Sequence, residues 1–146
     1  MKAKEILKVK GPEVFTIGED KSLYDAQKVL ITNNIGVLLV LDRNGKIIGI
    51  LSERDILRES YKSPNSYKDI KVKDVMSKDV IIVEPEDDLD YIESIMTEKR
   101  IRHLPVVNKK VLVGLISIGD IVKAMYNKTQ AEIKYLRDYI SGDMPK

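Results

Sequence analysis

The chain has 146 residues, of which 43% are hydrophobic and 33% charged, with a net charge of +2. This composition excludes a disordered polypeptide and fits one domain, or two small units that share a core. The absence of cysteine excludes disulfides, thiolate zinc sites and cysteine nucleophiles. No apolar run reaches the ~20 residues of a membrane helix, and no signal peptide is recognisable, so we expect a cytoplasmic protein.

The chain contains an internal repeat with an offset of 66 residues, which falls to 65 after the first hairpin turn. Three pairs of segments match: 14–17 with 80–83, 38–40 with 104–106, and 49–52 with 114–117. The segments that lead into the repeats, 4–7 and 73–76, also resemble each other. A repeat of this length indicates one small structural unit used twice.

Each repeat predicts the element order β-α-β-β-α. The first is expected to contain strand 14–17, an amphipathic helix capped by Ser22 with Leu23, Ala26 and Leu30 on one face, strands 37–41 and 47–51 joined at Asn44-Gly45, and a helix from Glu53. The second is expected to contain strand 80–83, a helix capped by Asp88 with Leu89, Ile92 and Met96 on one face, strands 104–107 and 111–116, and a helix from Ile118.

The fold class is therefore α/β (α+β): two β-α-β-β-α repeats that pack together, sheet to sheet, around a pseudo-twofold axis. We assign residues 1–62 to the first repeat with its lead-in, 63–68 to a linker, 69–126 to the second repeat and 127–146 to a C-terminal helix or tail.

The tail predicts a separate helix that starts at a Thr129 cap and ends at Gly142. Ile133, Leu136 and Ile140 form its apolar stripe. We expect this stripe to cover the domain's own surface; packing against a partner's helix is the alternative.

A Ser-x-x-Asp motif follows the last strand of each repeat, as Ser52-Glu53-Arg54-Asp55 and as Ser117-Ile118-Gly119-Asp120. Such a motif can be a capping box that satisfies the helix N-terminus. It can also form a nucleotide site, because free N–H groups and a hydroxyl attract phosphate while a carboxylate accepts from two sugar hydroxyls. Its recurrence after the same strand favours the second interpretation.

The pattern Gly-apolar-apolar-Ser-x-x-Asp, present twice with Arg102-His103-Leu104-Pro105 between the copies, resembles a tandem pair of CBS domains, also called a Bateman module. The resemblance implies a regulatory sensor with two clefts between the repeats, which bind AMP, ADP, ATP or S-adenosylmethionine. It also implies a homodimer and a regulated protein of unknown identity.

The resemblance also assigns roles to individual residues. Asp55 and Asp120 match ribose-binding aspartates, Ser52 and Ser117 the hydroxyls near phosphate, and Arg102 and His103 the cationic positions. Arg54 belongs to the first motif, and adenine is placed beside backbone near Thr16, Val80 and Ile81. Gly36 stands where the second repeat has Arg102, so the two clefts are expected to differ.

Other candidate sites are read as structural. A lone His103 gives neither a zinc site nor a paired nucleophile, and the acidic run 84–90 lacks a calcium-loop spacing. The lysines at 2, 4, 8 and 10 are read as a solvated basic segment, without the aromatic residues that stack on nucleic-acid bases. We therefore expect no catalysis, no metal and no nucleic-acid partner. A ligand-free module for dimerisation or protein interaction remains the alternative function.

Overall fold

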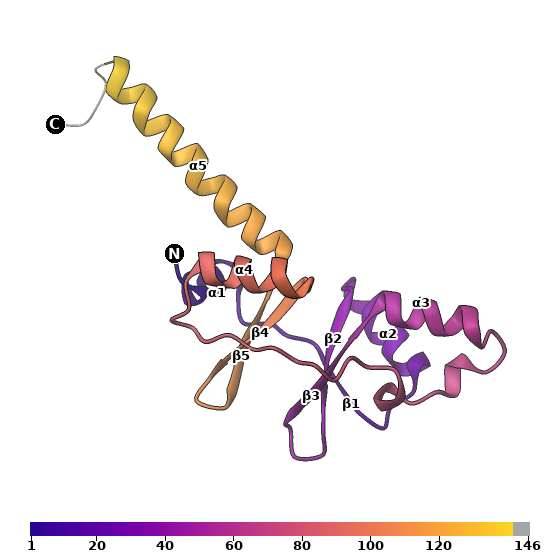
Figure 1. The fold of residues 1–146 in the computed structure, drawn as a ribbon. Helices are drawn as coiled ribbons and strands as arrows, with labels where there is room; N and C mark the ends of the chain where they lie inside the picture. The colour runs from indigo at the N-terminus through magenta and orange to yellow at the C-terminus, as the bar shows by residue number, and fades with distance from the viewer. Residues whose placement is uncertain (142–146) are drawn as a thin grey trace. The chain divides into compact units, whose positions relative to one another are not determined.

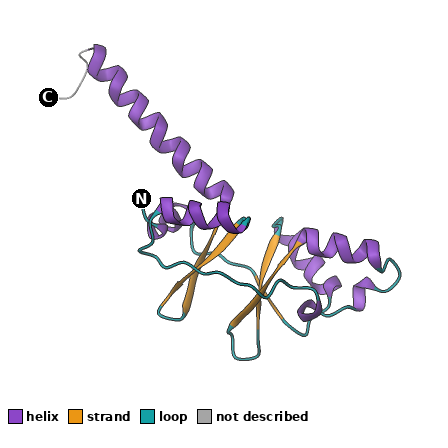
Figure 2. Ribbon diagram, in the orientation of Figure 1, coloured by secondary structure: helices purple, strands orange, loops and turns teal. Residues whose placement is uncertain are grey.

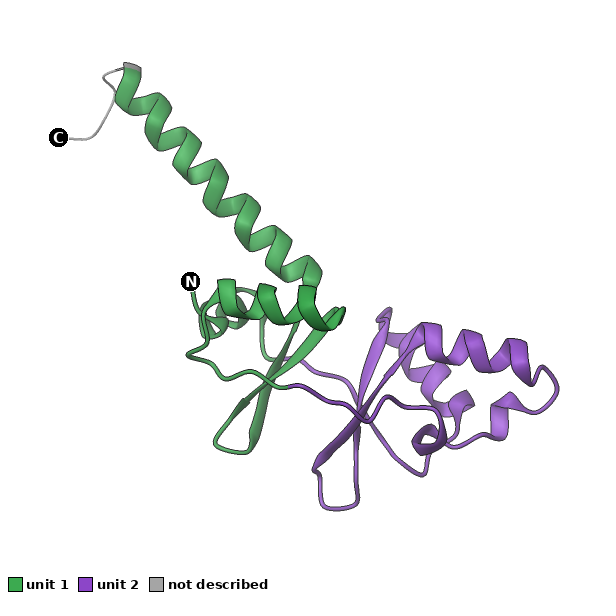
Figure 3. Ribbon diagram, viewed as in Figure 1, with its two compact units in different colours: residues 1–12, 82–146 green, residues 13–81 purple. Residues whose placement is uncertain are grey.

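The structure is a computed structural model that describes residues 1–141, apart from the side chain of Ser141. Its elements in chain order (Figures 1 and 2) are α1 (Ala3–Lys10), β1 (Thr16–Gly18), α2 (Leu23–Asn33), β2 (Val37–Leu41), β3 (Ile47–Ser52), α3 (Glu53–Lys62), the short 3₁₀ helices η1 (Tyr67–Asp69) and η2 (Val72–Asp74), α4 (Leu89–Lys99), β4 (His103–Asn108), β5 (Val111–Ser117) and α5 (Ile118–Ser141). They form two compact units (Figure 3): unit 1 comprises residues 1–12 with 82–146, and unit 2 comprises residues 13–81.

Unit 2 is built on a three-stranded sheet in the order β1-β2-β3. β1 lies parallel to β2, with α2 as the crossover, and β3 returns antiparallel through the turn at Gly45. The predicted apolar face of α2 is buried, as are four consecutive residues of β2, Val37–Val40. This burial on both faces of β2 explains its continuous apolar run.

Unit 2 is completed by the segment that follows α3. The amide of Leu23 donates to the carbonyl of Ile70, and Ser77 exchanges two backbone hydrogen bonds with Ile50 of β3. Val72 is fully buried in the same core as α2 and the sheet. The lead-in of the second repeat therefore packs on the first repeat.

Unit 1 is completed by the N-terminus of the chain. Its hairpin β4-β5 is antiparallel, and α1 contacts β5 and the start of α5. Ala3 and Ile6 of α1 are buried. Backbone hydrogen bonds from Ala3 and Lys4 to the 85–87 loop fix the start of α1.

The sequence repeats and the packed units thus divide the chain differently. Residues 1–12 belong to the first repeat by sequence but pack with the second, and residues 69–81 show the reverse exchange. Sequence similarity identified the two lead-ins as equivalent, but similarity alone does not state which repeat each one contacts.

The strand predicted at 80–83 is wrong, because only Val83 forms a single parallel bridge with Val106. In the first repeat the amide of Leu39 donates to the carbonyl of Phe15. The equivalent residue of the second repeat is Pro105, which has no N–H and loses that ladder bond. Beyond Val83, the Glu84 amide turns away and donates to the Asp87 carboxylate.

The predicted separate tail helix is also wrong. α5 runs without a break from Ile118 to Ser141, so Thr129 lies inside a helix and caps nothing. The predicted end at Gly142 lies outside the described residues. Across residues 1–141, no helix combines the length and the apolar character that crossing a bilayer requires.

In each hairpin, one glycine leaves room for a side chain of the lead-in segment that packs on that hairpin. A Cβ at Gly114 would lie 2.6 Å from Cδ2 of Leu7, and a Cβ at Gly49 would overlap the side chain of Met76. Leu7 and Met76 occupy matching positions in the two lead-ins. Both units therefore use the same close approach.

We expect Gly114→Ala to lower the free energy of unfolding by about 1–3 kcal/mol, because the new methyl group overlaps Leu7. Adding Leu7→Ala makes room for it, so the double variant is expected to be more stable than the two single effects predict when added. Urea denaturation of the four proteins measures this coupling.

Gly119→Ala is the matched control, because its Cβ would lie 3.6 Å from Ser117 Oγ, an ordinary contact in the first turn of α5. It is expected to be neutral, or stabilising by up to about 1 kcal/mol. Additive effects of Gly114→Ala and Leu7→Ala would show that α1 does not dock on β5 in this way.

Candidate functional site

The first Ser-x-x-Asp motif joins β3 to α3 as a complete capping box. The Ser52 amide donates to Asp55 Oδ2 at 2.9 Å, and the Asp55 amide donates to Ser52 Oγ at 3.2 Å. Both residues are partly buried. The box satisfies donors that a helix N-terminus leaves unpaired and fixes where the carboxylate points.

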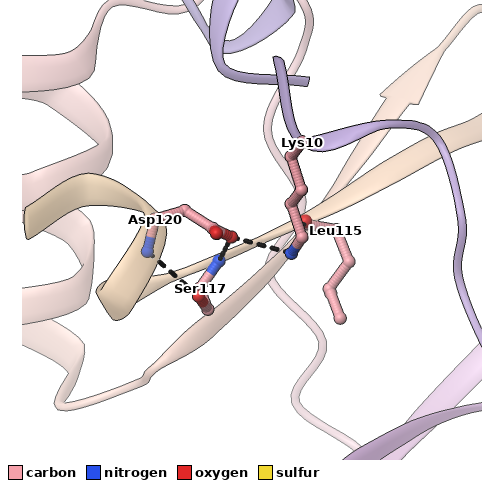
Figure 4. A network of polar contacts seen from close by, with 4 residues as sticks. All are labelled: Lys10, Leu115, Ser117 and Asp120. Carbon is pink, nitrogen blue, oxygen red and sulfur yellow. Dashed lines mark hydrogen bonds and ion pairs between the residues drawn. The ribbon is translucent and has the colours of Figure 1, made fainter. Parts of the chain in front are cut away.

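The second motif repeats this geometry between β5 and α5 (Figure 4). The Ser117 amide donates to Asp120 Oδ2 at 2.8 Å, and the Asp120 amide donates to Ser117 Oγ at 3.1 Å. The backbone around the two motifs matches as well, because the amides of Glu53 and Ile118 donate to the carbonyls of Gly36 and Arg102. The duplication therefore extends to the local structure of the site.

The Ser-x-x-Asp spacing also occurs at Ser66 to Asp69, where Ser66 makes no side-chain capping hydrogen bond. Another copy, Ser22-Leu23-Tyr24-Asp25, was not identified as such from the sequence. It forms the same box at the start of α2, with distances of 3.2 and 3.1 Å, although only the Ser22 cap was predicted. Its hydrogen bonds are exposed, and it follows a turn rather than the end of a strand. Capping geometry alone therefore does not mark a ligand site; the strand-end position and partial burial distinguish the other two.

Lys10 distinguishes the two strand-end motifs. From the last residue of α1, its Nζ donates to Asp120 Oδ2 and to the Leu115 carbonyl, both at 2.7 Å (Figure 4). The Lys10 and Asp120 side chains are only 32% and 22% exposed. Sequence reasoning did not find this contact, because the two residues are far apart in the chain and belong to different repeats.

Asp55 has no such close cation among the described ion pairs. Arg58 NH1 lies 3.6 Å from Asp55 Oδ1, and its side chain is exposed, so the attraction is weak. Three residues after Met76, where the first lead-in places Lys10 after Leu7, the second lead-in has Asp79. The two motifs are therefore alike in backbone and different in charge.

Burial and the charges around Asp120 together shift the pKa of two groups. Burial raises the pKa of Asp120, but the hydrogen bond from Lys10 and the contacts with Ser117 together bring it below its ordinary value. His103 opens β4 opposite Ser117, and burial, then Lys10 and Arg102, lower its pKa against the opposing effect of Asp120. Unit 1 thus brings Lys10, Arg102, His103 and Asp120 into one electrostatic cluster.

The remaining predicted site residues lie in unit 2. Thr16 is in β1 opposite Leu39, and Arg54 is exposed in the first turn of α3. Val80 and Ile81 lie outside regular strands and group with unit 2. The structure therefore gathers Ser52, Asp55 and Gly36 at one strand-to-helix junction, and Ser117, Asp120, Arg102 and His103 at another.

A hollow of about 350 Å³ lies between α2 and α3 in unit 2. Glu53 lines it together with apolar residues that include Leu30 and Leu57, but Ser52 and Asp55 do not. We place the candidate site at the motifs rather than in this hollow, because the polar groups able to recognise a ligand gather at the motifs.

The acidic run and the N-terminal lysines pair with each other. Nζ atoms of Lys2 and Lys4 each lie 2.7 Å from a Glu86 carboxylate oxygen, and these hydrogen bonds lower the pKa of Glu86 to about 2. The lysine segment is thus partly ion-paired rather than simply solvated. Within residues 1–141, no group of three or more acidic or histidine side chains is placed to hold a metal ion.

The chain belongs to the CBS-domain family, because the family model described as CBS domain matches residues 3–62 and 72–127. It is 37% identical over 127 residues to the mitochondrial CBS domain-containing protein CBSX3 of Arabidopsis thaliana. That match covers 84% of this chain and 62% of the plant protein, so the chain spans less than two thirds of this relative.

Two solved structures resemble most of the chain. A CBS-domain protein from Agrobacterium tumefaciens has a TM-score of 0.80 and 35% identity, over 85% of this chain and 92% of the other. A CBS-domain pair crystallised with 5'-methylthioadenosine and S-adenosyl-L-methionine has a TM-score of 0.74 and 25% identity, over 88% and 98%. These comparisons confirm the predicted resemblance to a pair of CBS domains and the mixed α/β fold class.

His103 is expected to make stability depend on pH. Its pKa in the folded protein lies below its ordinary 6.5, so the unfolded chain binds a proton more readily. The folded protein therefore loses stability as the pH falls below about 6.5 and keeps its full stability above that value. His103→Gln is expected to remove this loss.

Urea denaturation of both proteins across a pH series measures the effect, because the titrations common to both cancel in the difference. The free energy of unfolding of wild type, relative to that of the variant, is expected to fall as the pH drops through the titration of His103. A difference that does not change with pH would contradict the burial of a neutral imidazole beside Lys10.

Proposed function

We propose that the chain is a regulatory module that binds an adenosine-containing ligand at its strand-end Ser-x-x-Asp motifs. AMP, ADP, ATP and S-adenosylmethionine are the candidate ligands, and a regulated protein of unknown identity would receive the signal. Membership of the CBS family supports a regulatory rather than a catalytic role. The similar CBS-domain pair with two bound adenosyl compounds supports the ligand class.

The observation that carries the proposal is the orientation of Asp55 and Asp120. Their capping hydrogen bonds end on Oδ2, as does the contact from Lys10. Oδ1 of each carboxylate is then the oxygen that can accept from a ribose hydroxyl while the helix cap stays intact. Capping and sugar binding are compatible uses of one aspartate.

The charge difference between the motifs predicts different preferences. In unit 1, Lys10 and Arg102 supply positive charge for a phosphate, and the neutral His103 can donate a hydrogen bond to it. In unit 2, Gly36 replaces the arginine, and the exposed Arg58 is the cation facing Asp55. We therefore assign phosphate-bearing adenosine to unit 1 and a neutral or cationic tail, as in S-adenosylmethionine, to unit 2.

A ligand regulates only through its different affinity for two states of the protein. The alternative function, a ligand-free assembly module, is favoured by one observation: the outer half of α5 has an exposed apolar stripe. Assembly through α5 does not exclude ligand binding, so a ligand test decides whether the module is ligand-free.

Thermal shift with AMP, ADP, ATP, S-adenosylmethionine and 5'-methylthioadenosine tests ligand binding. A bound ligand stabilises by RT ln(1 + [L]/Kd), about 2.7 kcal/mol at a hundredfold excess over Kd. Asp55→Asn and Asp120→Asn are each expected to remove part of the shift, because the amide keeps a capping acceptor and loses the charge that attracts two hydroxyl donors.

Asp25→Asn is the matched control, because it makes the same change in a capping box without a proposed ligand. It is expected to leave the shift unchanged. Absence of a shift with every ligand in the panel would refute the ligand proposal and leave the assembly function. An equal loss in all three variants would assign the effect to capping alone.

Lys10→Met tests the assignment of phosphate to unit 1. Loss of the ammonium group is expected to weaken AMP binding by about tenfold, and to leave 5'-methylthioadenosine binding unchanged or tighter, because Asp120 is released. Lys8→Met, an exposed residue of the same helix, is the control. Calorimetric titration measures both ligands, and equal weakening of both would contradict a phosphate contact.

A further inference from the structure

The outer part of α5 carries an apolar face that is exposed in the described part of unit 1. Figure 3 shows α5 extending beyond the rest of this unit. From Tyr126 to Ile140 every side chain except Asp138 is exposed. Helices in proteins draw most of their stability from packing of an apolar face, so a segment of this length is marginal when nothing covers it.

The exposed face carries a heptad pattern. Six residues on this face are spaced alternately four and three positions apart in the sequence: Val122, Tyr126, Thr129, Ile133, Leu136 and Ile140. Five of them are large apolar or aromatic residues, 42–84% exposed. Ile121, which is buried in unit 1, lies off this stripe, so docking of α5 on its own unit leaves the stripe uncovered.

The pattern assigns Tyr126, Ile133 and Ile140 to position a and Val122, Thr129 and Leu136 to position d. β-branched residues at a with leucine at d favour two parallel strands. Here two of the three a positions are isoleucine, and one d position is leucine. The C-terminal part of the stripe, Ile133, Leu136 and Ile140, therefore has the side chains of a short parallel helix pair.

The charges beside the stripe agree with the parallel arrangement. Glu132 occupies position g, and Arg137 occupies position e of the following heptad. In a parallel pair, g of one helix faces this e of the other, so two Glu132–Arg137 ion pairs form. In an antiparallel pair, e positions face each other and bring Lys123 and Arg137 against like charges.

We propose that this stripe binds the same stripe of a second copy of the chain, forming a parallel two-stranded coiled coil over residues 122–140. A second copy is the proposed partner because two copies of the stripe are complementary, both in their apolar a and d positions and in their g and e charges. The coiled-coil proposal does not depend on ligand binding, so an experiment can contradict either proposal and leave the other standing.

Sedimentation equilibrium of the full chain measures the dimer. Wild type is expected to be a dimer, and Leu136→Glu is expected to raise the dissociation constant by about tenfold or more, because it places two carboxylates in the apolar seam. Tyr135→Glu adds the same charge on the outer face of the helix and is expected to leave the constant unchanged. A wild-type monomer, or equal effects of the two variants, would overturn the proposal.

The relative direction of the two α5 helices is tested with introduced cysteines, because the natural chain has none. Thr129→Cys places a thiol at a d position, where equivalent residues of two parallel helices face each other, so oxidation is expected to give a disulfide-linked dimer. Tyr135→Cys, on the outer face, is expected to remain unlinked. A Thr129→Cys dimer that does not cross-link on oxidation would overturn the parallel pairing.

The ion pairs provide a second test that does not disturb the apolar seam. Glu132→Arg and Arg137→Glu are each expected to weaken the dimer, since each brings like charges together. The double variant is expected to recover the wild-type constant, because it restores opposite charges in the same positions. Independent, additive losses would overturn the g-to-e pairing.

Discussion

Each unit depends on an apolar side chain from a lead-in segment that packs against a glycine of its hairpin. Leu7 occupies the space above Gly114, and Met76 occupies the space above Gly49. A side chain at either glycine would displace the lead-in. Because the two contacts are equivalent, the duplicated sequence encodes one packing solution twice, with the two lead-ins exchanged between the repeats.

The same docking determines the character of the candidate site. Three residues beyond Leu7, α1 ends at Lys10, which reaches Asp120 and the end of β5. The ammonium group thus comes from outside the repeat that supplies the carboxylate. The electrostatic difference between the two nearly identical capping boxes therefore arises partly from the lead-ins, which the β-α-β-β-α repeat does not contain, and partly from Arg102, which aligns with Gly36.

The repeat, the hairpins and the starts of α3 and α5 could be predicted, because apolar periodicity, Asn44-Gly45 and the Ser-x-x-Asp spacing are local signals. The β-branched composition of residues 80–83 predicts a strand there. The strand does not form, because Pro105 has no N–H to donate to it. The Lys10 contact depends on tertiary packing. The sequence predicts a helix start at Thr129 because threonine is a common N-cap. In the heptad pattern, Thr129 instead occupies a d position inside the continuous helix α5.

The exchange of lead-ins also orders events during synthesis. Residues 13–81 are contiguous, so unit 2 has its whole sequence available once residue 81 has left the ribosome. α1 emerges before unit 2 but docks on β5, so it cannot pack until residues near 117 have been made. The apolar side of α1 therefore stays uncovered while residues 13–117 are synthesised, and α1 can pack only after the whole sequence of unit 2 is available.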